Sequence, residues 1–121
     1  MHIRLATLSE RQVLEDLQRR ASLANPGDRE ALLANPDVFG VPLEQITDGH
    51  VIVIEANGGL KGFAAIVPRD DGGAELDALF VEPDSWGQGY GRALVEHGVA
   101  MARARGAAAL NVIGNPHAEG F

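Results

Sequence analysis

Hydrophobic and polar positions follow a helical period in some parts of the chain and a strand period in others. Residues 2–7 alternate as a short strand does, and residues 9–24 place apolar side chains at helical spacing. Ser9 stands three residues before Gln12, which predicts a capping box at the start of this helix, and the Asn-Pro-Gly of residues 25–27 should end it. The expected apolar face of the helix consists of Val13, Leu14, Leu17, Ala21 and Ala24.

Two shorter helical signals follow this first helix. Asp28 can cap a helix that runs through residues 30–34 and stops at Asn35-Pro36. One further turn of helix is expected after Pro42, in a segment of otherwise irregular pattern that reaches residue 50.

From residue 51 the pattern becomes that of a sheet. Residues 51–54 form a short β-branched apolar run, typical of a strand buried on both faces. An Asn-Gly-Gly turn leads to a partner strand over residues 60–67, and an Asp-Asp-Gly-Gly turn leads to a third strand over residues 74–81. Simple alternation in that third strand puts two sets of side chains on opposite faces. One set is Leu76, Ala78 and Phe80, and the other is Glu75, Asp77, Leu79 and Val81.

The last third of the chain predicts one helix and one strand. The helix covers residues 92–105 and stops at Gly106, and the strand covers residues 108–113. The order is strand, helix, helix, antiparallel meander, helix, strand. We therefore expect one domain over residues 1–121, of the mixed α/β class, with a largely antiparallel sheet flanked by helices.

Composition and charge exclude several functions. The chain has 121 residues, 45% of them hydrophobic, and contains no cysteine, which excludes a disulfide framework, a cysteine-ligated zinc site and thiol catalysis. A net charge of −7 argues against a general nucleic-acid partner. We also expect no metal, because the four histidines lack ligand spacing, and no membrane partner, because no long apolar run is present. A cytoplasmic protein is expected.

The stretch that suggests chemistry is VEPDSWGQGYGRAL, residues 81–94. Its glycines at 87, 89 and 91 follow a strand and open a helix. Glycine lets the backbone turn tightly and approach a ligand, and the free N–H groups of a helix N-terminus attract anions. Arg92 adds positive charge, so the stretch predicts a pyrophosphate cradle made mainly of backbone amides. A glycine-rich connector without a ligand is the alternative.

The distribution of charge and the glycine spacing refine this hypothesis. Residues 51–85 carry seven acidic and two basic side chains, whereas residues 86–121 carry two acidic and three basic ones, so an anion is repelled less there. The GxGxG spacing and its position after a hairpin differ from a dinucleotide-binding GxGxxG loop, and no GxxxxGK[ST] sequence is present.

The pattern Leu79-Phe80-Val81-x-Pro83-x-x-Trp86-Gly87-x-Gly89-Tyr90-Gly91-x-x-Leu94 resembles the acyl-CoA motif of the GNAT family of acetyl-CoA-dependent N-acetyltransferases. Asn115-x-x-Ala118-x-x-Phe121 is a second, weaker match, and the element order is similar over nearly the whole chain. The resemblance implies that main-chain groups of Leu79 and Val81 pair with the pantetheine arm and that the amides of residues 87–92 bind the pyrophosphate. The cofactor-binding residues implied are Leu79, Phe80, Val81, Gly87, Gln88, Gly89, Tyr90, Gly91, Arg92 and Asn115.

Two departures from the family pattern affect the expectations. Trp86 stands where the family usually has Arg or Gln, and we expect it to be a packing residue. The pattern in the family continues beyond Phe121 into a Tyr that often serves as general acid, a helix and two strands. We expect either a truncated form or a sheet completed in another way. From this we expect a homodimer, or an exchange of C-terminal segments, that covers the outer edge of residues 108–113.

The resemblance implies an N-acetyltransferase that moves an acetyl group from acetyl-CoA to a primary amine of a small molecule or peptide. Direct attack is expected, because the chain offers no cysteine nucleophile. Glu75 is the candidate general base, with Asp77 second, although both could belong to a solvated face. Phe39 and Leu43 are candidates for shaping the acceptor site. The alternatives are an acyl-CoA-binding GNAT-like module with little or no turnover, and a nucleotide-binding domain of another fold.

Overall fold

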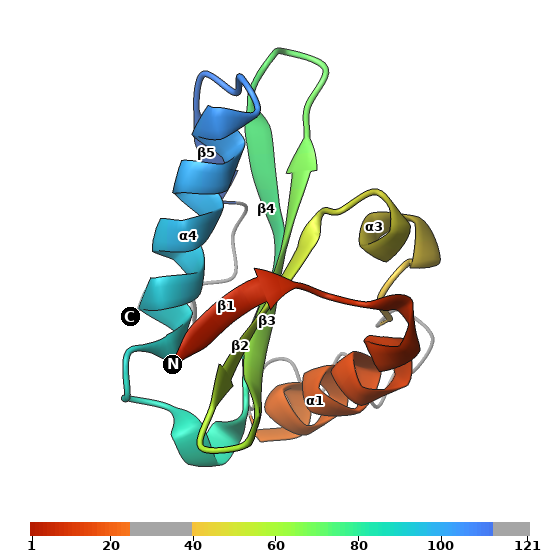
Figure 1. Cartoon of the computed structure of the whole chain (residues 1–121), viewed down its shortest axis with the longest axis vertical. Coiled ribbons are helices and arrows are strands. Elements are labelled where there is room, and N and C mark those ends of the chain that lie inside the picture. Colours follow the sequence, from red (N-terminus) through yellow and green to blue (C-terminus); the bar gives the residue numbers. More distant parts are fainter. Residues whose placement is uncertain (25–39, 113–121) are drawn as a thin grey trace.

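The structure is a computed structural model that describes residues 1–24 and 40–112 (Figure 1). The helix expected over residues 30–34 lies outside the described residues, as do the candidates Phe39 and Asn115.

Within residues 1–24 and 40–112, five strands form a single sheet in the order β1-β2-β3-β4-β5. Neighbours from β1 to β4 run antiparallel, whereas β5 runs parallel to β4. The mixed, largely antiparallel sheet predicted from the sequence is therefore confirmed. The strands are β1 (His2–Leu5), β2 (Val51–Ala56), β3 (Gly59–Pro68), β4 (Ala74–Val81) and β5 (Leu110–Val112).

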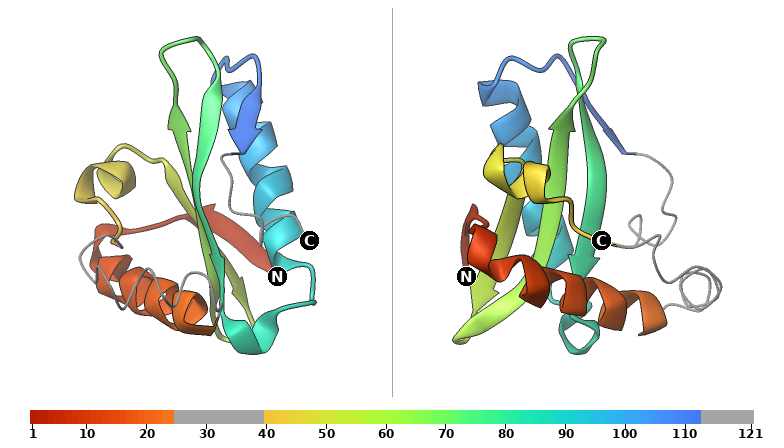
Figure 2. Two further views of the ribbon diagram at one scale, coloured as in Figure 1. Left: turned by 180° about the vertical axis from the view of Figure 1, so that it is seen from behind. Right: turned by 90° about the vertical axis from the view of Figure 1, so that its right-hand side faces the viewer.

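Helices cover both faces of the sheet. α1 (Arg11–Ala24) and α3 (Leu43–Thr47) lie on one face and α4 (Tyr90–Ala104) lies on the other (Figures 1 and 2). Short 3₁₀ turns, η1 (Leu8–Glu10) and η3 (Pro83–Ser85), precede α1 and the loop before α4. The helical turn expected after Pro42 is α3. None of the helices in residues 1–24 and 40–112 is long and apolar enough to cross a membrane.

Each face of the sheet has its own apolar core. Alternation along β2 directs Val51 and Val53 toward α1 and directs Ile52 and Ile54 toward α4. All four side chains are buried, as the continuous apolar run predicted. The central strands are thus fixed from both sides.

The buried face of α1 differs from the predicted one. Leu14, Leu17 and Ala21 are buried, but Val13 and Ala24 are exposed. The buried stripe follows positions 14, 17, 18, 21 and 22, so residues 13 and 24 lie at its margin.

The start of α1 also differs from the prediction. β1 ends at Leu5 and Thr7 is the N-cap of η1, where the Glu10 carboxylate accepts a hydrogen bond of 2.9 Å from the Thr7 N–H. The capping box expected at Ser9 and Gln12 is wrong. Thr7 and Glu10 have the same three-residue spacing, and the earlier end of β1 lets the chain turn there.

A β-bulge interrupts β4 at Asp77. Ala65 of β3 pairs with Ala78, and the next residue, Ile66, pairs with Leu76. Asp77 is therefore an extra residue on β4, which shifts the alternation of the strand by one position.

The bulge corrects the predicted faces of β4. Leu76 was expected to share a face with Ala78 and Phe80, and this is wrong. Leu76 packs in the core under α4, together with Leu79 and Val81, whereas Ala78 and Phe80 pack against the core under α1. The reason is the residue inserted between the two halves of the strand.

α4 lies close to the sheet at Gly98. A Cβ atom on Gly98 would meet Ile66 Cδ1 at 2.8 Å, which is shorter than van der Waals contact. Leu94 and Ala102 are buried on the same helical face, one turn to either side. The absence of a side chain at position 98 therefore lets α4 approach Ile66 closely.

Candidate active site

The glycine loop turns sharply before α4. Gly87 and Gly89 have φ of +80° and +85°, and Gly89 is the N-cap of the helix. A Cβ atom at either position would meet no atom within 4 Å, so the space in front of the loop is open. The Ala93 N–H donates to the Gly89 carbonyl at 3.0 Å, which leaves the amides of residues 90–92 without an acceptor inside the helix. Free amides of this kind are the groups with which helix N-termini bind anions.

Beside this loop β4 extends beyond the described part of β5. Their pairing ends at Leu76 and Val112, and β4 continues through residues 77–81 without a strand partner on that side in the described part of the chain. We call the side of β4 along residues 77–81, where the described residues place no strand, the gap; it leads toward the glycine loop.

Main-chain groups of β4 face the gap. The Glu82 N–H donates to the Lys61 carbonyl at 2.8 Å, so Glu82 and Phe80 direct their backbone groups toward β3. Since successive residues of an antiparallel strand alternate in this respect, Leu79 and Val81 direct theirs toward the gap. An extended ligand could pair with this edge as a strand would.

Trp86 connects the loop to the same edge. Its indole Nε1 donates a 2.8 Å hydrogen bond to the Val81 carbonyl, while the residue remains 49% exposed. Trp86 was expected to be a packing residue, but in the structure its indole N–H makes a hydrogen bond. The sequence carried no signal for this contact, because the acceptor is a backbone atom.

A cavity of about 300 Å³ lies on the other side of β4, under α1 and α3. We call it the Asp77 pocket, because Asp77 is the charged residue among those described as lining it. Gln45 Nε2 of α3 donates to Asp77 Oδ2 at 2.9 Å. The bulge turns Asp77 toward this pocket. The lining residues are Gln18, Gly40, Val41, Gln45, Phe63, Asp77, Ala78 and Phe80.

Glu75 lies apart from that pocket. It is opposite Val67 of β3 and Asn111 of β5, within the part of β4 that has a strand on each side, and it is half-buried. The structure thus separates the two candidate bases, and Asp77 is the one beside both the gap and the cavity.

The sequence profile of the acetyltransferase (GNAT) family matches residues 12–121, which is most of the chain. The protein belongs to the GNAT acetyltransferase family. No match was found among curated protein sequences.

Solved structures of GNAT proteins have the same fold. A ribosomal-protein-alanine N-acetyltransferase from Brucella melitensis is 26% identical, with a TM-score of 0.71 over 99% of this chain and 80% of that chain. N-acetylglutamate synthase from Neisseria gonorrhoeae, complexed with coenzyme A and N-acetyl-glutamate, is 25% identical with a TM-score of 0.73. That match covers 99% of this chain but only 26% of the synthase. A Mycobacterium tuberculosis protein in complex with CoA is 18% identical, with a TM-score of 0.72 over 96% of this chain and 66% of that chain.

The remaining candidate residues of this GNAT domain lie in different environments. Tyr90 is buried against the core under α4, whereas Gln88 and Arg92 are exposed and Arg92 Nε bonds Glu96 at 3.2 Å. Phe80 stacks on Phe63 with ring centroids 5.6 Å apart, on the face away from α4. Its ring therefore lines the Asp77 pocket.

Two further expectations concern the acceptor site and metals. Leu43 is 40% exposed and does not line the Asp77 pocket. Gln45, two residues later, does line it, and periodicity could not single out that residue. Within residues 1–24 and 40–112, no three His, Asp or Glu side chains converge as a metal site would require.

Proposed function

We propose that this chain transfers the acetyl group of acetyl-CoA to a primary amine. The observation that carries the proposal is the edge of β4 along residues 77–81, which has no strand partner within the described residues and leads to amides at the start of α4 that have no acceptor inside the helix. A strand edge followed by an anion site fits a ligand that has an extended amide chain next to a pyrophosphate. Acetyl-CoA has this arrangement.

The pyrophosphate would be bound by the amides of residues 87–92, and the pantetheine arm would pair with Leu79 and Val81. Within the described residues, both main-chain groups of Leu79 are available at this edge. The Val81 carbonyl already accepts from Trp86, so its N–H is the group that remains for the ligand. The open space at Gly87 and Gly89 supports a close approach of the phosphates.

The acceptor amine would enter from the Asp77 pocket, on the opposite side of β4. Phe63 and Phe80 offer an apolar wall, and Asp77 offers a carboxylate to an ammonium group. This arrangement favours an amine attached to an apolar or aromatic body. The terminal amine of a peptide that begins with alanine is a further candidate, given the name of the Brucella relative.

The chemical step would be direct attack within a ternary complex. The amine nitrogen forms a bond to the acetyl carbonyl carbon, the carbon–sulfur bond breaks, and the CoA thiolate leaves and takes a proton from solvent. The proton lost by the amine goes to a carboxylate, for which Asp77 is better placed than Glu75. The chain has no cysteine that could carry the acetyl group between two steps.

Calorimetric titration with acetyl-CoA, followed by an assay of CoA release with phenethylamine and an alanine-initiated peptide, tests this proposal. Saturable binding together with amine-dependent CoA release is expected. Binding without release from any amine would indicate the acyl-CoA-binding module instead, and no binding would contradict both functions.

A further inference from the structure

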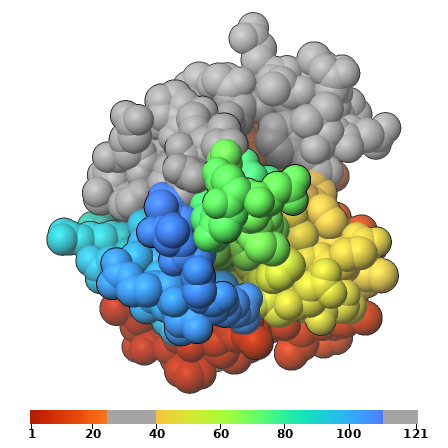
Figure 3. Space-filling view, turned by 90° about the horizontal axis from the view of Figure 1, so that it is seen from above, coloured from red at the N-terminus to blue at the C-terminus, as the bar shows by residue number. Residues whose placement is uncertain are grey.

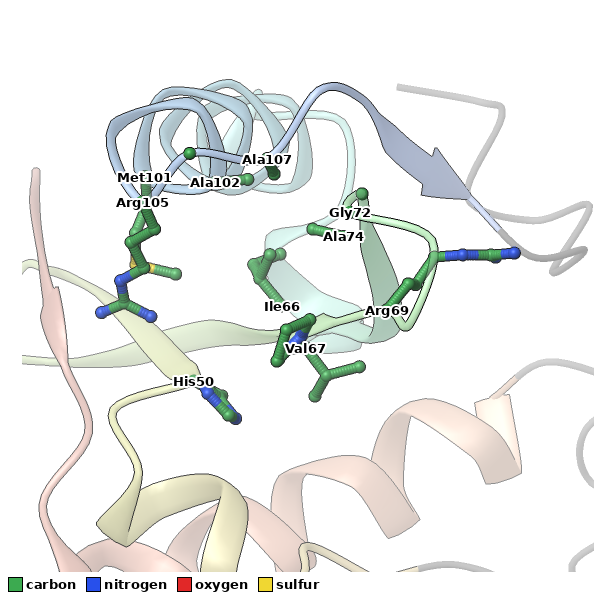
Figure 4. A pocket seen from close by; sticks show the side chains of 13 residues that line it. His50, Ile66, Val67, Arg69, Gly72, Ala74, Met101, Ala102, Arg105 and Ala107 are labelled. Carbon is green, nitrogen blue, oxygen red and sulfur yellow. The ribbon is translucent and has the colours of Figure 1, made fainter.

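A second cavity, of about 290 Å³, lies at the end of the sheet away from the glycine loop. Three segments surround it: the C-terminal end of α4, the turn between β3 and β4, and the residue before β2 (Figure 4). From above, the β3–β4 turn lies between the end of α4 and the α3 segment (Figure 3). We call this cavity the distal pocket. Its volume is near the lower end of small-molecule sites, about 300–1,000 Å³.

Backbone hydrogen bonds hold the walls of the distal pocket in place. The Ala108 N–H donates to the Gly72 carbonyl at 3.1 Å, and the Ala74 N–H donates to the Ala109 carbonyl at 2.8 Å. These bonds fasten the segment after α4 to the β3–β4 turn. The pocket is therefore formed by the fold itself, before any ligand arrives.

The floor of the distal pocket is apolar and its charged rim is basic. Ile66, Ala74 and Ala102 are buried at the floor. His50, Arg69 and Arg105 are the titratable residues among those described as lining the pocket, and no carboxylate is included. Such a rim is unusual in a chain whose net charge is −7.

Arg105 is the side chain best placed to receive an anion. Its Nη1 donates to the Gly49 carbonyl at 2.9 Å, which anchors the guanidinium on the side of the pocket where His50 lies. Within the described residues its Nε and Nη2 make no hydrogen bond, so two donors of the planar group stay available. The guanidinium of Arg69 points away from the pocket in Figure 4, and its Nε bonds Asp71 at 3.3 Å.

The end of α4 repels an anion less strongly than a helix C-terminus whose carbonyl groups are all free. The Ala107 N–H donates to the Ala102 carbonyl at 2.9 Å, and the Gly106 N–H donates to the Arg103 carbonyl at 3.0 Å. These carbonyls are already hydrogen-bonded, which reduces their exposed negative charge.

We propose that the distal pocket binds a small organic anion, namely a carboxylate on a compact apolar body. The body would pack on Ile66, Ala74 and Ala102, and the carboxylate would accept from Arg105 with His50 beside it. A charged hydrogen bond to a guanidinium combined with apolar burial gives both orientation and affinity. None of the lining residues belongs to the glycine loop or to the Asp77 pocket, so this site is separate from acetyl transfer.

The test is an amide chemical-shift titration of the full chain with benzoate and with benzamide, which has the same shape but no charge. Benzoate should shift amides around His50, Gly73 and Arg105, and benzamide should bind clearly more weakly. Arg105→Gln should weaken benzoate binding about tenfold, because one charge-assisted hydrogen bond is lost. Arg103→Gln is the matched control: it removes the same charge from the same helix end, outside the lining, and should leave binding unchanged.

A second variant keeps the test decisive if Arg105→Gln unfolds the chain. Ala107→Leu should fill the pocket from its rim and abolish benzoate binding. Its amide spectrum should still be that of a folded chain. The proposal is overturned if benzamide binds as well as benzoate, if Arg103→Gln weakens binding as much as Arg105→Gln, or if the shifts occur only in residues 87–92.

Discussion

The indole N–H of Trp86 is hydrogen-bonded to the carbonyl oxygen of Val81, over a distance of 2.8 Å. This bond ties the entrance of the glycine loop to the last residue of β4. It also occupies one of the acceptors along the edge where we place the pantetheine arm. Trp86 therefore acts on the proposed CoA site through the backbone.

Trp86→Phe tests that role, because phenylalanine keeps an aromatic body but has no N–H. We expect acetyl-CoA affinity to fall roughly fivefold and stability to fall by about 1 kcal/mol, as for one lost hydrogen bond. Calorimetry and urea unfolding measure the two effects. If both quantities stay at wild-type values, the bond does not hold the loop.

Gly89→Val tests the anion cradle. The residue has φ of +85°, and a branched side chain there would occupy the open space in front of the amides of α4. We expect acetyl-CoA binding to weaken at least tenfold in calorimetry.

Gly58→Val is the control for Gly89→Val. Gly58 also has a positive φ, +81°, and open space for a Cβ atom, but it lies in the turn between β2 and β3. Its substitution should cost similar backbone strain and leave CoA binding intact. Equal losses of binding in both variants would point to general destabilisation rather than to a phosphate site.

Asp77→Asn and Glu75→Gln distinguish the two candidate bases. Asparagine can still accept from Gln45, so the Asp77 change removes charge with little change of shape. We expect kcat/KM for the amine to fall about a hundredfold in Asp77→Asn, with CoA affinity unchanged, and to stay near wild type in Glu75→Gln. The reverse result would restore Glu75 as the base predicted from the sequence.

The stability contributed by the Arg4–Glu10 ion pair should depend on pH. Arg4 Nη2 donates to Glu10 Oε2 at 2.7 Å, and the hydrogen bonds from Arg4, together with those from Thr7, lower the pKa of Glu10 from 4.5 to about 2. Because the folded pKa lies below the unfolded one, the stabilisation is complete above pH 4.5 and is lost as the pH falls toward about 2.

Glu10→Gln measures this contribution. The ion pair is partly exposed, with Arg4 also bonded to Glu55, so we expect a loss of about 1 kcal/mol at neutral pH. Urea unfolding at about pH 6 and about pH 3 should show a smaller pH effect in the variant than in the wild type. Glu44→Gln is the control, since the Glu44 carboxylate makes no ion pair within the described residues. Identical pH profiles for wild type and Glu10→Gln would contradict the assignment.

We also propose that two copies of the chain associate through β5. This strand stands last in the sheet order, so its outer backbone edge has no strand partner within the described residues. Exposed strand edges tend to recruit another chain. Light scattering at micromolar concentration should show a dimer, with the amides of residues 110–112 protected from exchange; a monomer with the same protection would argue against it.

Most of the fold could be predicted from the sequence, because the pattern of apolar residues and turn residues indicates most of the strands and helices. The buried run Val51–Ile54 and the glycine turns give β2, β3 and β4 with bounds close to those observed. α4 begins at Tyr90 rather than residue 92, because the N-cap is the second glycine of the loop. Local propensity and tertiary packing agree in these elements.

The candidate site was only partly predictable. The glycine loop is visible as a motif, but the bulge at Asp77 is not, because a strand with one extra residue has no distinct local pattern. Simple alternation therefore misplaced Leu76 relative to Ala78. The contact of Gln45 with Asp77 spans 32 residues along the chain, and only the packing of α3 on the sheet brings the two together.

Gly98 has a consequence for both proposed sites. It stands near the middle of α4, at the point where the helix touches Ile66. The amides that face the proposed CoA site lie at the start of α4, and Arg105 follows directly after its end. A methyl group at position 98 would force either the side chain of Ile66 or the helix itself to shift, and a shift of the helix would reach both ligand sites through a single substitution.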